Sequence, residues 1–107
     1  MPAILIIDDD PVFGMLQKKI LTRAGRNCEV TESGSDGLRL IREQGFGIVL
    51  LDIHLRDMSG IELLREIKTR SPLTEVIMIT GDDDTKTAID CIRQGAFEYL
   101  IKPLDQE

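Results

Sequence analysis

"AILIIDDDP", residues 3–11, runs from an apolar stretch directly into three adjacent carboxylates and a proline. An apolar run without polar alternation is typical of a strand buried on both faces, as in a parallel sheet. Asp10 followed by Pro11 predicts the N-cap and the first residue of a helix. Two like charges about 4 Å apart repel by roughly 4 kcal/mol at an effective dielectric constant near 20. The carboxylates of Asp8, Asp9 and Asp10 therefore need water, a helix end or a bound cation.

The same alternation of apolar runs and helical patterns continues along the chain. After the run at 3–7, we expect strands at "NCEVTE" (27–32), "GIVLLD" (47–52), "EVIMIT" (75–80) and "FEYLI" (97–101). We expect helices capped by Asp10, Ser35 and Asp84 and a further helix at about 59–70. The first helix carries apolar residues at helical spacing: Val12, Phe13, Leu16 and Ile20. Alternating elements joined by right-handed crossovers give a parallel sheet with helices on both faces. The sequence therefore predicts a single α/β domain.

Composition excludes several classes of protein. The chain has 107 residues and a net charge of −6, which argues against binding of nucleic acid or an anionic membrane by this domain itself. Its only cysteines, Cys28 and Cys91, are far apart, which favours a reducing compartment and small core residues with free thiols. No run approaches the ~20 apolar residues of a membrane span, and no signal peptide is visible. We expect a cytoplasmic protein.

The last residues begin an element that they do not complete. After Lys102-Pro103, the segment "LDQE" reads as the start of a fifth helix, with Asp105 as its cap. A sheet covered on both faces needs that helix. We therefore expect a fragment of a longer protein, or else a bare face covered by another chain, for example in a homodimer.

Functional groups lie where the expected strands end. Asp8, Asp9 and Asp10 follow the first strand and Asp52 follows the third. The fourth strand ends in Thr80-Gly81 and the fifth is followed by Lys102. Ligands of open parallel sheets bind beyond the carboxyl ends of the strands. These side chains should therefore converge at one rim.

The residue types at this rim point to phosphoryl chemistry. Carboxylates without a His or Cys ligand set select a hard cation such as Mg²⁺, with Mn²⁺ as a substitute. A carboxylate can also attack phosphorus to give an aspartyl phosphate. Phosphoryl transfer needs a metal on one side, and an ammonium with hydroxyl or N–H donors on the other. The rim carries each of these parts.

The segments "ILIIDDDP", "IVLLDIHLRDMSGIELL", "VIMITGDD" and "GAFEYLIKP" occur in this order between residues 3 and 103. With them the sequence resembles the receiver domain of bacterial two-component response regulators. The resemblance implies a flavodoxin-like (CheY-like) three-layer sandwich with a five-stranded parallel sheet in the order 2-1-3-4-5 and a truncated or missing fifth helix. It also implies that residues 1–107 are a receiver domain, followed in the parent chain by a C-terminal output domain.

The resemblance assigns roles to the rim residues. Asp52 would be the phosphoacceptor. The metal ligands would be Asp52, Asp9, Asp8 (often through water) and the backbone carbonyl of His54. The phosphoryl group would contact Lys102, Thr80 and Gly81, and the bond between Lys102 and Pro103 would be cis. Thr80 and Tyr99 would form a switch, with Tyr99 rotating inward and changing the surface of the fourth helix and fifth strand.

One departure from the family pattern lies in the loop after Asp52. The family often has Met-Pro where this chain has Leu55-Arg56, so we expect a looser loop that keeps its metal ligands. His54 and Asp82 occupy positions that tune the lifetime of the phosphate in this family. We therefore expect a change at Asp82 to alter the rate of dephosphorylation.

The implied function is a signalling switch rather than an enzyme. A sensor histidine kinase or a phosphotransfer protein would donate the phosphoryl group, and an output domain or separate target would read the result. One alternative is a phosphohydrolase of the haloacid-dehalogenase type, although its nucleophile normally lies on the first strand and its chain is longer. A degenerate receiver that only docks to partners is a second alternative. A flavodoxin-type electron carrier is a third, without an evident aromatic pair or phosphate loop.

Overall fold

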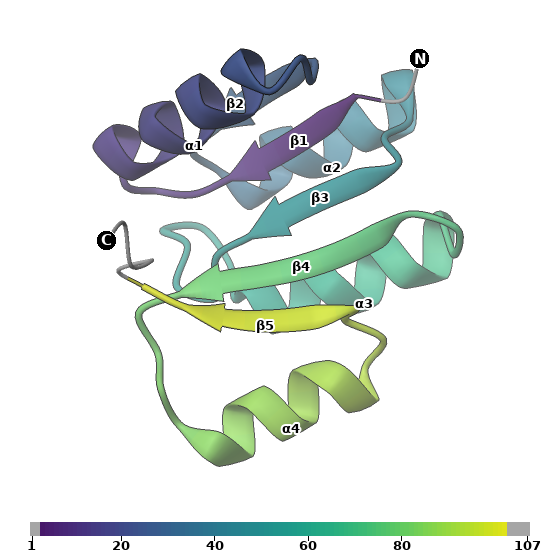
Figure 1. Ribbon diagram of the computed structural model, residues 1–107. Helices are drawn as coiled ribbons and strands as arrows, with labels where there is room; N and C mark the ends of the chain where they lie inside the picture. The colour runs from purple at the N-terminus through teal and green to yellow at the C-terminus, as the bar shows by residue number, and fades with distance from the viewer. Residues whose placement is uncertain (1–2, 103–107) are drawn as a thin grey trace.

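The computed structural model describes residues 3–102, in which strands and helices alternate (Figure 1). Their bounds are β1 Ile4–Ile7, α1 Pro11–Arg23, β2 Cys28–Thr31, α2 Gly34–Gln44, β3 Ile48–Leu51, α3 Gly60–Arg70, β4 Glu75–Thr80, α4 Thr85–Arg93 and β5 Glu98–Ile101. The strands form one parallel sheet in the order β2-β1-β3-β4-β5. This order confirms the predicted flavodoxin-like fold. The expected fifth helix and the Lys102–Pro103 bond lie outside the described residues.

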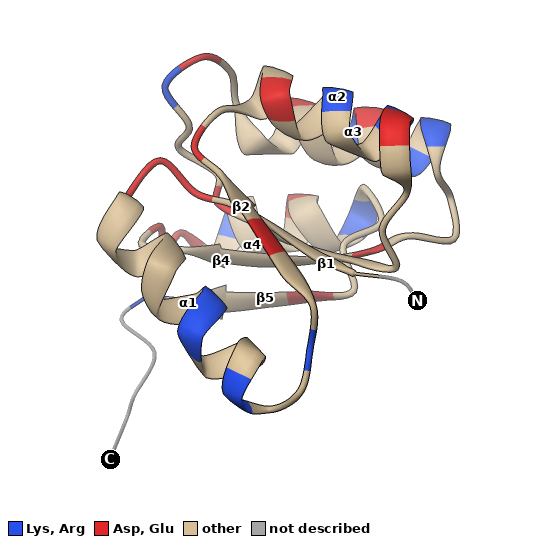
Figure 2. Cartoon of the chain, turned by 90° about the horizontal axis from the view of Figure 1, so that it is seen from above, with Lys and Arg blue, Asp and Glu red and all other residues tan. Residues whose placement is uncertain are grey.

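Helices α2 and α3 cover one face of the sheet, α1 lies on the other, and α4 runs beside β5 (Figures 1 and 2). Successive strand residues point to opposite faces, so Leu5 and Ile7 enter the core with α2 and α3, while Ile6 faces α1. All three are fully buried. Burial on both faces explains the continuous apolar run that opens the chain. None of the described helices has the length and apolar character needed to span a bilayer.

Two of the three predicted helix caps are confirmed. The Asp10 carboxylate accepts hydrogen bonds from the amides of Val12 (3.0 Å) and Phe13 (3.2 Å), and Asp84 accepts one from the amide of Lys86. The prediction for the second helix was wrong, because Ser33 and not Ser35 caps α2. The Ser33 backbone is extended and its hydroxyl accepts from the amide of Asp36 at 3.1 Å.

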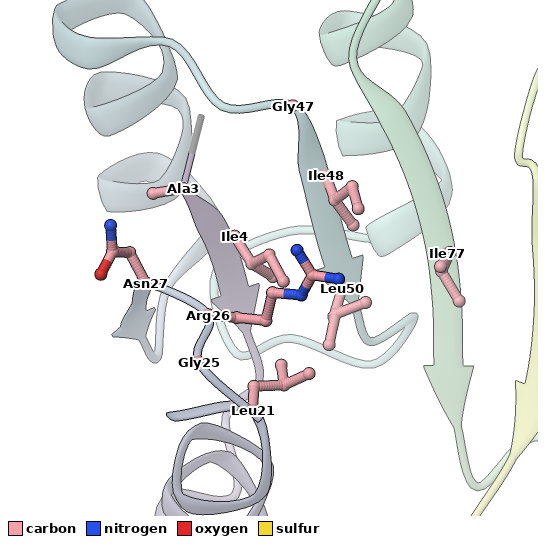
Figure 3. A pocket seen from close by; sticks show the side chains of 10 residues that line it. All are labelled: Ala3, Ile4, Leu21, Gly25, Arg26, Asn27, Gly47, Ile48, Leu50 and Ile77. Atoms are coloured by element: carbon pink, nitrogen blue, oxygen red, sulfur yellow. The ribbon is translucent and has the colours of Figure 1, made fainter. Parts of the chain in front are cut away.

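The apolar face expected on α1 is partly exposed. Val12, Leu16 and Ile20 remain 77%, 44% and 47% exposed. Beside α1 an apolar hollow of about 510 Å³ opens over the sheet, near the amino ends of β1 and β3 (Figure 3). Within residues 3–102 no second helix lies beside α1 on this face, so the predicted covering of both faces is incomplete there.

The two cysteines are both free thiols. Cys91 is fully buried in the core, as expected, and burial raises its pKa to about 11. Cys28 is only half-buried on the outer strand β2, so it is less of a core residue than the sequence suggested.

Gly60, the first residue of α3, lies against the backbone that carries Asp52. Its amide donates to the carbonyl of Ile53 at 2.6 Å. A Cβ atom at Gly60 would come within 2.6 Å of the Ile53 Cα and closer still to the Asp52 carbonyl. Backbone atoms cannot rotate out of the way, so only glycine lets α3 begin this close to β3.

Replacing Gly60 with Ala should therefore lower the free energy of unfolding by about 1–3 kcal/mol, the usual cost of overpacking. Gly81→Ala is the matched control, because no atom lies within 4 Å of the position its Cβ would take; we expect it to change stability by less than about 0.5 kcal/mol. Urea denaturation measures both. Equal stability of the two variants would contradict the proposed close approach.

Candidate functional site

Asp8 and Asp52 are brought side by side by the pairing of β1 with β3. In the parallel register Ile7 lies opposite Leu51, so the next residue of each strand is an aspartate. The Asp52 amide donates to the Ile7 carbonyl at 3.0 Å, which extends the ladder by one residue. Both side chains are buried, with residue exposures of 2% and 6%. The sheet therefore holds two carboxylates together at its carboxyl edge, as the sequence predicted.

Asp9 completes a cluster of three carboxylates. One oxygen from each of Asp8, Asp9 and Asp52 lies within 4.8 Å of the others. Unlike the other two, Asp9 is partly exposed, so the cluster opens to solvent on its side. Asp10 is turned away, because its carboxylate caps α1. The run of three acids at 8–10 thus separates into two cluster members and one helix cap.

Lys102 supplies the positive charge of the site. It follows β5, where its amide donates to the Thr80 carbonyl at 2.7 Å. The Lys102 Nζ lies 2.9 Å from Asp8 Oδ2 and 3.1 Å from Asp52 Oδ2. It also stands 4.5 Å above the centre of the Phe13 ring, at a distance suited to a cation–π contact. The predicted convergence of Lys102 with Asp52 is therefore present.

The electrostatics of the cluster are dominated by burial. Burial raises the pKa of Asp8 above its ordinary value, although the hydrogen bond from Lys102 works against the shift. Burial also favours the neutral amine of Lys102, but its hydrogen bonds to Asp8 and Asp52 outweigh this effect and raise its pKa. The site therefore favours the charged form of Lys102 and disfavours the charged form of Asp8.

These residues fit a hard divalent cation. Three carboxylates face a single ammonium, so the cluster keeps a net negative charge when all are ionised. The raised pKa of Asp8 indicates that one ammonium does not fully compensate its buried charge. Oxygen ligands from one or two carboxylates with an open side for water are what Mg²⁺ prefers. The set contains the predicted ligands Asp8, Asp9 and Asp52.

Thr80, Gly81 and Tyr99 lie around the loop between β4 and α4. Thr80 is fully buried, and its hydroxyl accepts from the Asp82 amide at 3.3 Å. The Tyr99 hydroxyl donates to the Asp82 carbonyl at 2.6 Å, and its ring is half-buried against the core. Burial raises the pKa of Tyr99 to about 12. Among the described residues, the two predicted switch side chains thus meet at the backbone of Asp82.

His54 connects the loop after Asp52 to the same Asp82. Its imidazole Nε2 lies 3.1 Å from Asp82 Oδ2, and the ring is 71% exposed. Its amide donates to Asp52 Oδ1 at 3.4 Å. Hydrogen bonds, first from the Asp84 amide and then from His54, hold the pKa of Asp82 below its usual value. The two residues expected to tune the lifetime of the phosphate, His54 and Asp82, are therefore in direct contact.

Sequence reasoning missed three residues that touch the site or its loop. Phe13 is one of the apolar residues of the first helix, and its ring lies under the Lys102 ammonium. The Arg56 guanidinium donates to the Asp9 carbonyl at 3.4 Å, and Asp57 accepts two amide hydrogen bonds from α2. No local pattern marks the last two, because their partners lie more than twenty residues away in the sequence.

Comparison with known proteins decides among the families considered. Residues 4–107 match the response regulator receiver domain family. The chain belongs to this family. The receiver domain is the signalling module of two-component response regulators, which sets aside the haloacid-dehalogenase and flavodoxin alternatives.

Individual relatives agree with this assignment. The transcriptional regulatory protein ZraR of Escherichia coli is 38% identical over 102 residues, which are 95% of this chain but 23% of ZraR. A CheY-like receiver domain protein from Methanospirillum hungatei has a TM-score of 0.93 and 33% identity, over 98% of this chain and 84% of the other. A response regulator from Burkholderia pseudomallei, solved with a phosphorylated aspartic acid, calcium ion and citrate, has a TM-score of 0.92 and 28% identity, over 98% and 62%. The chain spans less than a quarter of the length of ZraR.

Replacing Asp8 with Asn should stabilise the metal-free receiver domain at pH 7, because it removes a buried charge that its surroundings disfavour and leaves Lys102 paired with Asp52. Asn has one acceptor oxygen, so it keeps only one of the two hydrogen bonds that Asp8 accepts, from Lys102 on Oδ2 and from the Asp10 amide on Oδ1, and this loss limits the gain. Since the folded-state pKa of Asp8 is raised, the gain should be complete above that pKa and vanish as the pH falls below the ordinary value of 3.8. Urea denaturation in the presence of a chelator, repeated across this pH range, tests it. A loss of stability in Asp8→Asn at pH 7 would contradict the assigned cause of the shift.

Proposed function

We propose that Asp52 of this receiver domain accepts a phosphoryl group in a Mg²⁺-dependent reaction. One observation carries the proposal: the Lys102 ammonium lies between Asp8 and Asp52, and the Asp9 carboxylate stands beside them. A buried nucleophile, a cation-binding cluster and a fixed positive charge are the parts that phosphoryl transfer requires. The related Burkholderia pseudomallei protein was solved with a phosphorylated aspartic acid and a metal ion, which supports the same chemistry here.

In the proposed reaction an Asp52 oxygen attacks phosphorus and forms a P–O bond. If the donor is a phosphohistidine, its P–N bond breaks and the electron pair returns to the imidazole nitrogen. Asp8 and Asp9, with Asp52 and the His54 carbonyl, would hold Mg²⁺, which supplies positive charge against the phosphoryl oxygens. Lys102 would exchange part of its contact with Asp52 for a phosphoryl oxygen, and Thr80 with Gly81 would contact another.

Thr80 and Tyr99 form the proposed readout. Both contact the Asp82 backbone, Thr80 at the amide and Tyr99 at the carbonyl. If the Thr80 hydroxyl turns to the phosphoryl group, it must release the Asp82 amide. The loop and the Tyr99 ring would then readjust, and with them the surface formed by α4 and β5. This surface would pass the phosphorylation state to an output.

The partners follow from this switch. A sensor histidine kinase or a phosphotransfer protein would phosphorylate Asp52, so the domain acts as a signalling phosphoacceptor and not as a turnover enzyme. Because ZraR is a transcriptional regulator more than four times as long as the matched segment, we propose that residues 1–107 are the receiver part of a longer cytoplasmic chain with a C-terminal output domain. Nucleic acid would be bound by that domain and not by this acidic one.

Incubation with acetyl phosphate and Mg²⁺ should add the mass of one phosphoryl group to the wild type and none to Asp52→Asn. Intact mass spectrometry measures the product, and hydroxylamine should remove it, as expected of an acyl phosphate. Asp83→Asn is the matched control, because Asp83 is an exposed acid of the neighbouring loop; it should be labelled like the wild type. Failure of the folded wild type to be labelled would favour the degenerate docking module.

Replacing Asp82 with Asn should accelerate loss of the phosphoryl group several-fold. The change removes the charged partner of His54 and so loosens the link between the loops that flank Asp52. The decay of phosphorylated protein, followed by intact mass after removal of acetyl phosphate, measures the rate. His54→Gln should show a similar effect, and the double variant should add little to either, because both changes break one contact. An unchanged decay in Asp82→Asn would refute the role.

A further inference from the structure

The loop between β3 and α3, residues 52–59, is tied to the start of α2 by one carboxylate. Asp57 Oδ1 accepts from the Gly34 amide at 2.9 Å, and Asp57 Oδ2 accepts from the Ser35 amide at 3.0 Å. These amides belong to the first turn of a helix, where N–H groups have no partner within the helix. Ser33 takes the next one, that of Asp36. Asp57 and Ser33 therefore share the N-terminus of α2 between them.

Both oxygens of Asp57 are engaged, so the contact restrains the loop as well as the helix. These two amide hydrogen bonds, the one from Ser35 most of all, hold the pKa of Asp57 below its usual value. Next to it, Met58 fills the space above Gly34, where a Cβ would come within 2.5 Å of the Met58 side chain. The carboxylate remains charged at neutral pH, which suits the positive end of the helix dipole.

The same loop reaches the acidic cluster through its neighbouring residues. Arg56, next to Asp57, donates to the Asp9 carbonyl at 3.4 Å. His54, three residues before Asp57, donates its amide to Asp52 Oδ1 and pairs with Ser59 across the loop. The contact of Asp57 with α2 therefore restricts the positions of His54, which touches the Asp52 carboxylate, and of Arg56, which touches the Asp9 backbone.

We propose that Asp57 is a positioning residue for the metal site. By holding the loop on α2, it keeps the His54 carbonyl and Arg56 in place before the cation arrives. A free loop would have to lose its conformational freedom on binding, which would weaken the affinity for Mg²⁺. This inference rests on the proposed function, because it assumes that the acidic cluster holds Mg²⁺ with help from the His54 carbonyl.

Thermodynamic linkage makes the effect reciprocal. If the contact with α2 strengthens Mg²⁺ binding, then Mg²⁺ must strengthen the contact by the same factor. The first turn of α2 would therefore be stabilised by a cation that it does not touch. Gly34 and Ser35 are the amides at which this would be seen, because they donate directly to Asp57.

Calorimetric titration of the 107-residue chain with Mg²⁺ tests the proposal on four proteins: the wild type, Asp57→Ala, Asp57→Asn and Ser33→Ala. We expect Asp57→Ala to raise the Kd for Mg²⁺ about fivefold. Asp57→Asn should give a smaller rise, since an amide can accept only one of the two hydrogen bonds. Ser33→Ala is the matched control: it removes a hydrogen bond from the same helix end without touching the loop, so its Kd should equal that of the wild type.

Amide hydrogen exchange gives a second readout. In the wild type, Mg²⁺ should slow exchange at Gly34 and Ser35, and this slowing should be absent in Asp57→Ala. Without metal, Asp57→Ala should exchange faster than Ser33→Ala across residues 53–59. If Asp57→Ala does not fold, Asp57→Asn replaces it in both experiments.

Three outcomes would count against the proposal. If the wild type binds Mg²⁺ and Asp57→Ala binds it with the same Kd, this inference is overturned and the proposed function stands. An equal rise in Ser33→Ala also overturns it, because helix stability would then explain the effect. Failure of the folded wild type to bind Mg²⁺ overturns the proposed function and this inference with it.

Discussion

The ammonium of Lys102 between Asp8 and Asp52 is the interaction on which the site depends. Two carboxylates that are almost fully buried at adjacent strand ends repel each other, and the core beneath them offers no solvent. A charge from β5, two strands away from β3, makes their burial tolerable. The parallel register fixes where the two carboxylates and the ammonium leave the sheet. The strand pairing therefore also determines the charge balance of the site. The balance is incomplete, and the remaining negative charge is what suits the site to a cation.

Asp82 connects the residues around the site to one another through three hydrogen bonds. Its amide, carbonyl and carboxylate have different partners: Thr80, Tyr99 and His54, respectively. A single residue therefore connects the end of β4, the ring on β5 and the loop after β3. Each of the three links involves a side chain, and each is a hydrogen bond that can exchange its partner without unfolding a helix or strand. In the proposed switch, these contacts would carry a local change at Asp52 to the surface of α4 and β5.

Periodicity and end signals were sufficient to predict the element order, the parallel sheet and most of the site. The apolar run ending in Asp8 and the run ending in Asp52 were informative because strand ends in a parallel sheet share one edge. The cap of α2 was placed wrongly, since Ser33 and Ser35 are chemically equal and the choice depends on Asp57, which lies far along the chain. The tertiary contacts of Phe13 and Arg56 were missed for the same reason. Val12 shows a second limit of sequence reasoning. Helical spacing of apolar residues predicts an apolar face of α1, but it does not predict which element covers that face.

Gly60 holds the start of α3 directly against the end of β3. Because the first turn of the helix rests directly on the backbone of Asp52 and Ile53, helix and strand cannot slide past each other. An α-helix of this length, about 16 Å, is stiff, and its other end is at Arg70. A tilt of α3 about this contact would therefore displace the turn that leads into β4 more than it displaces Gly60 itself.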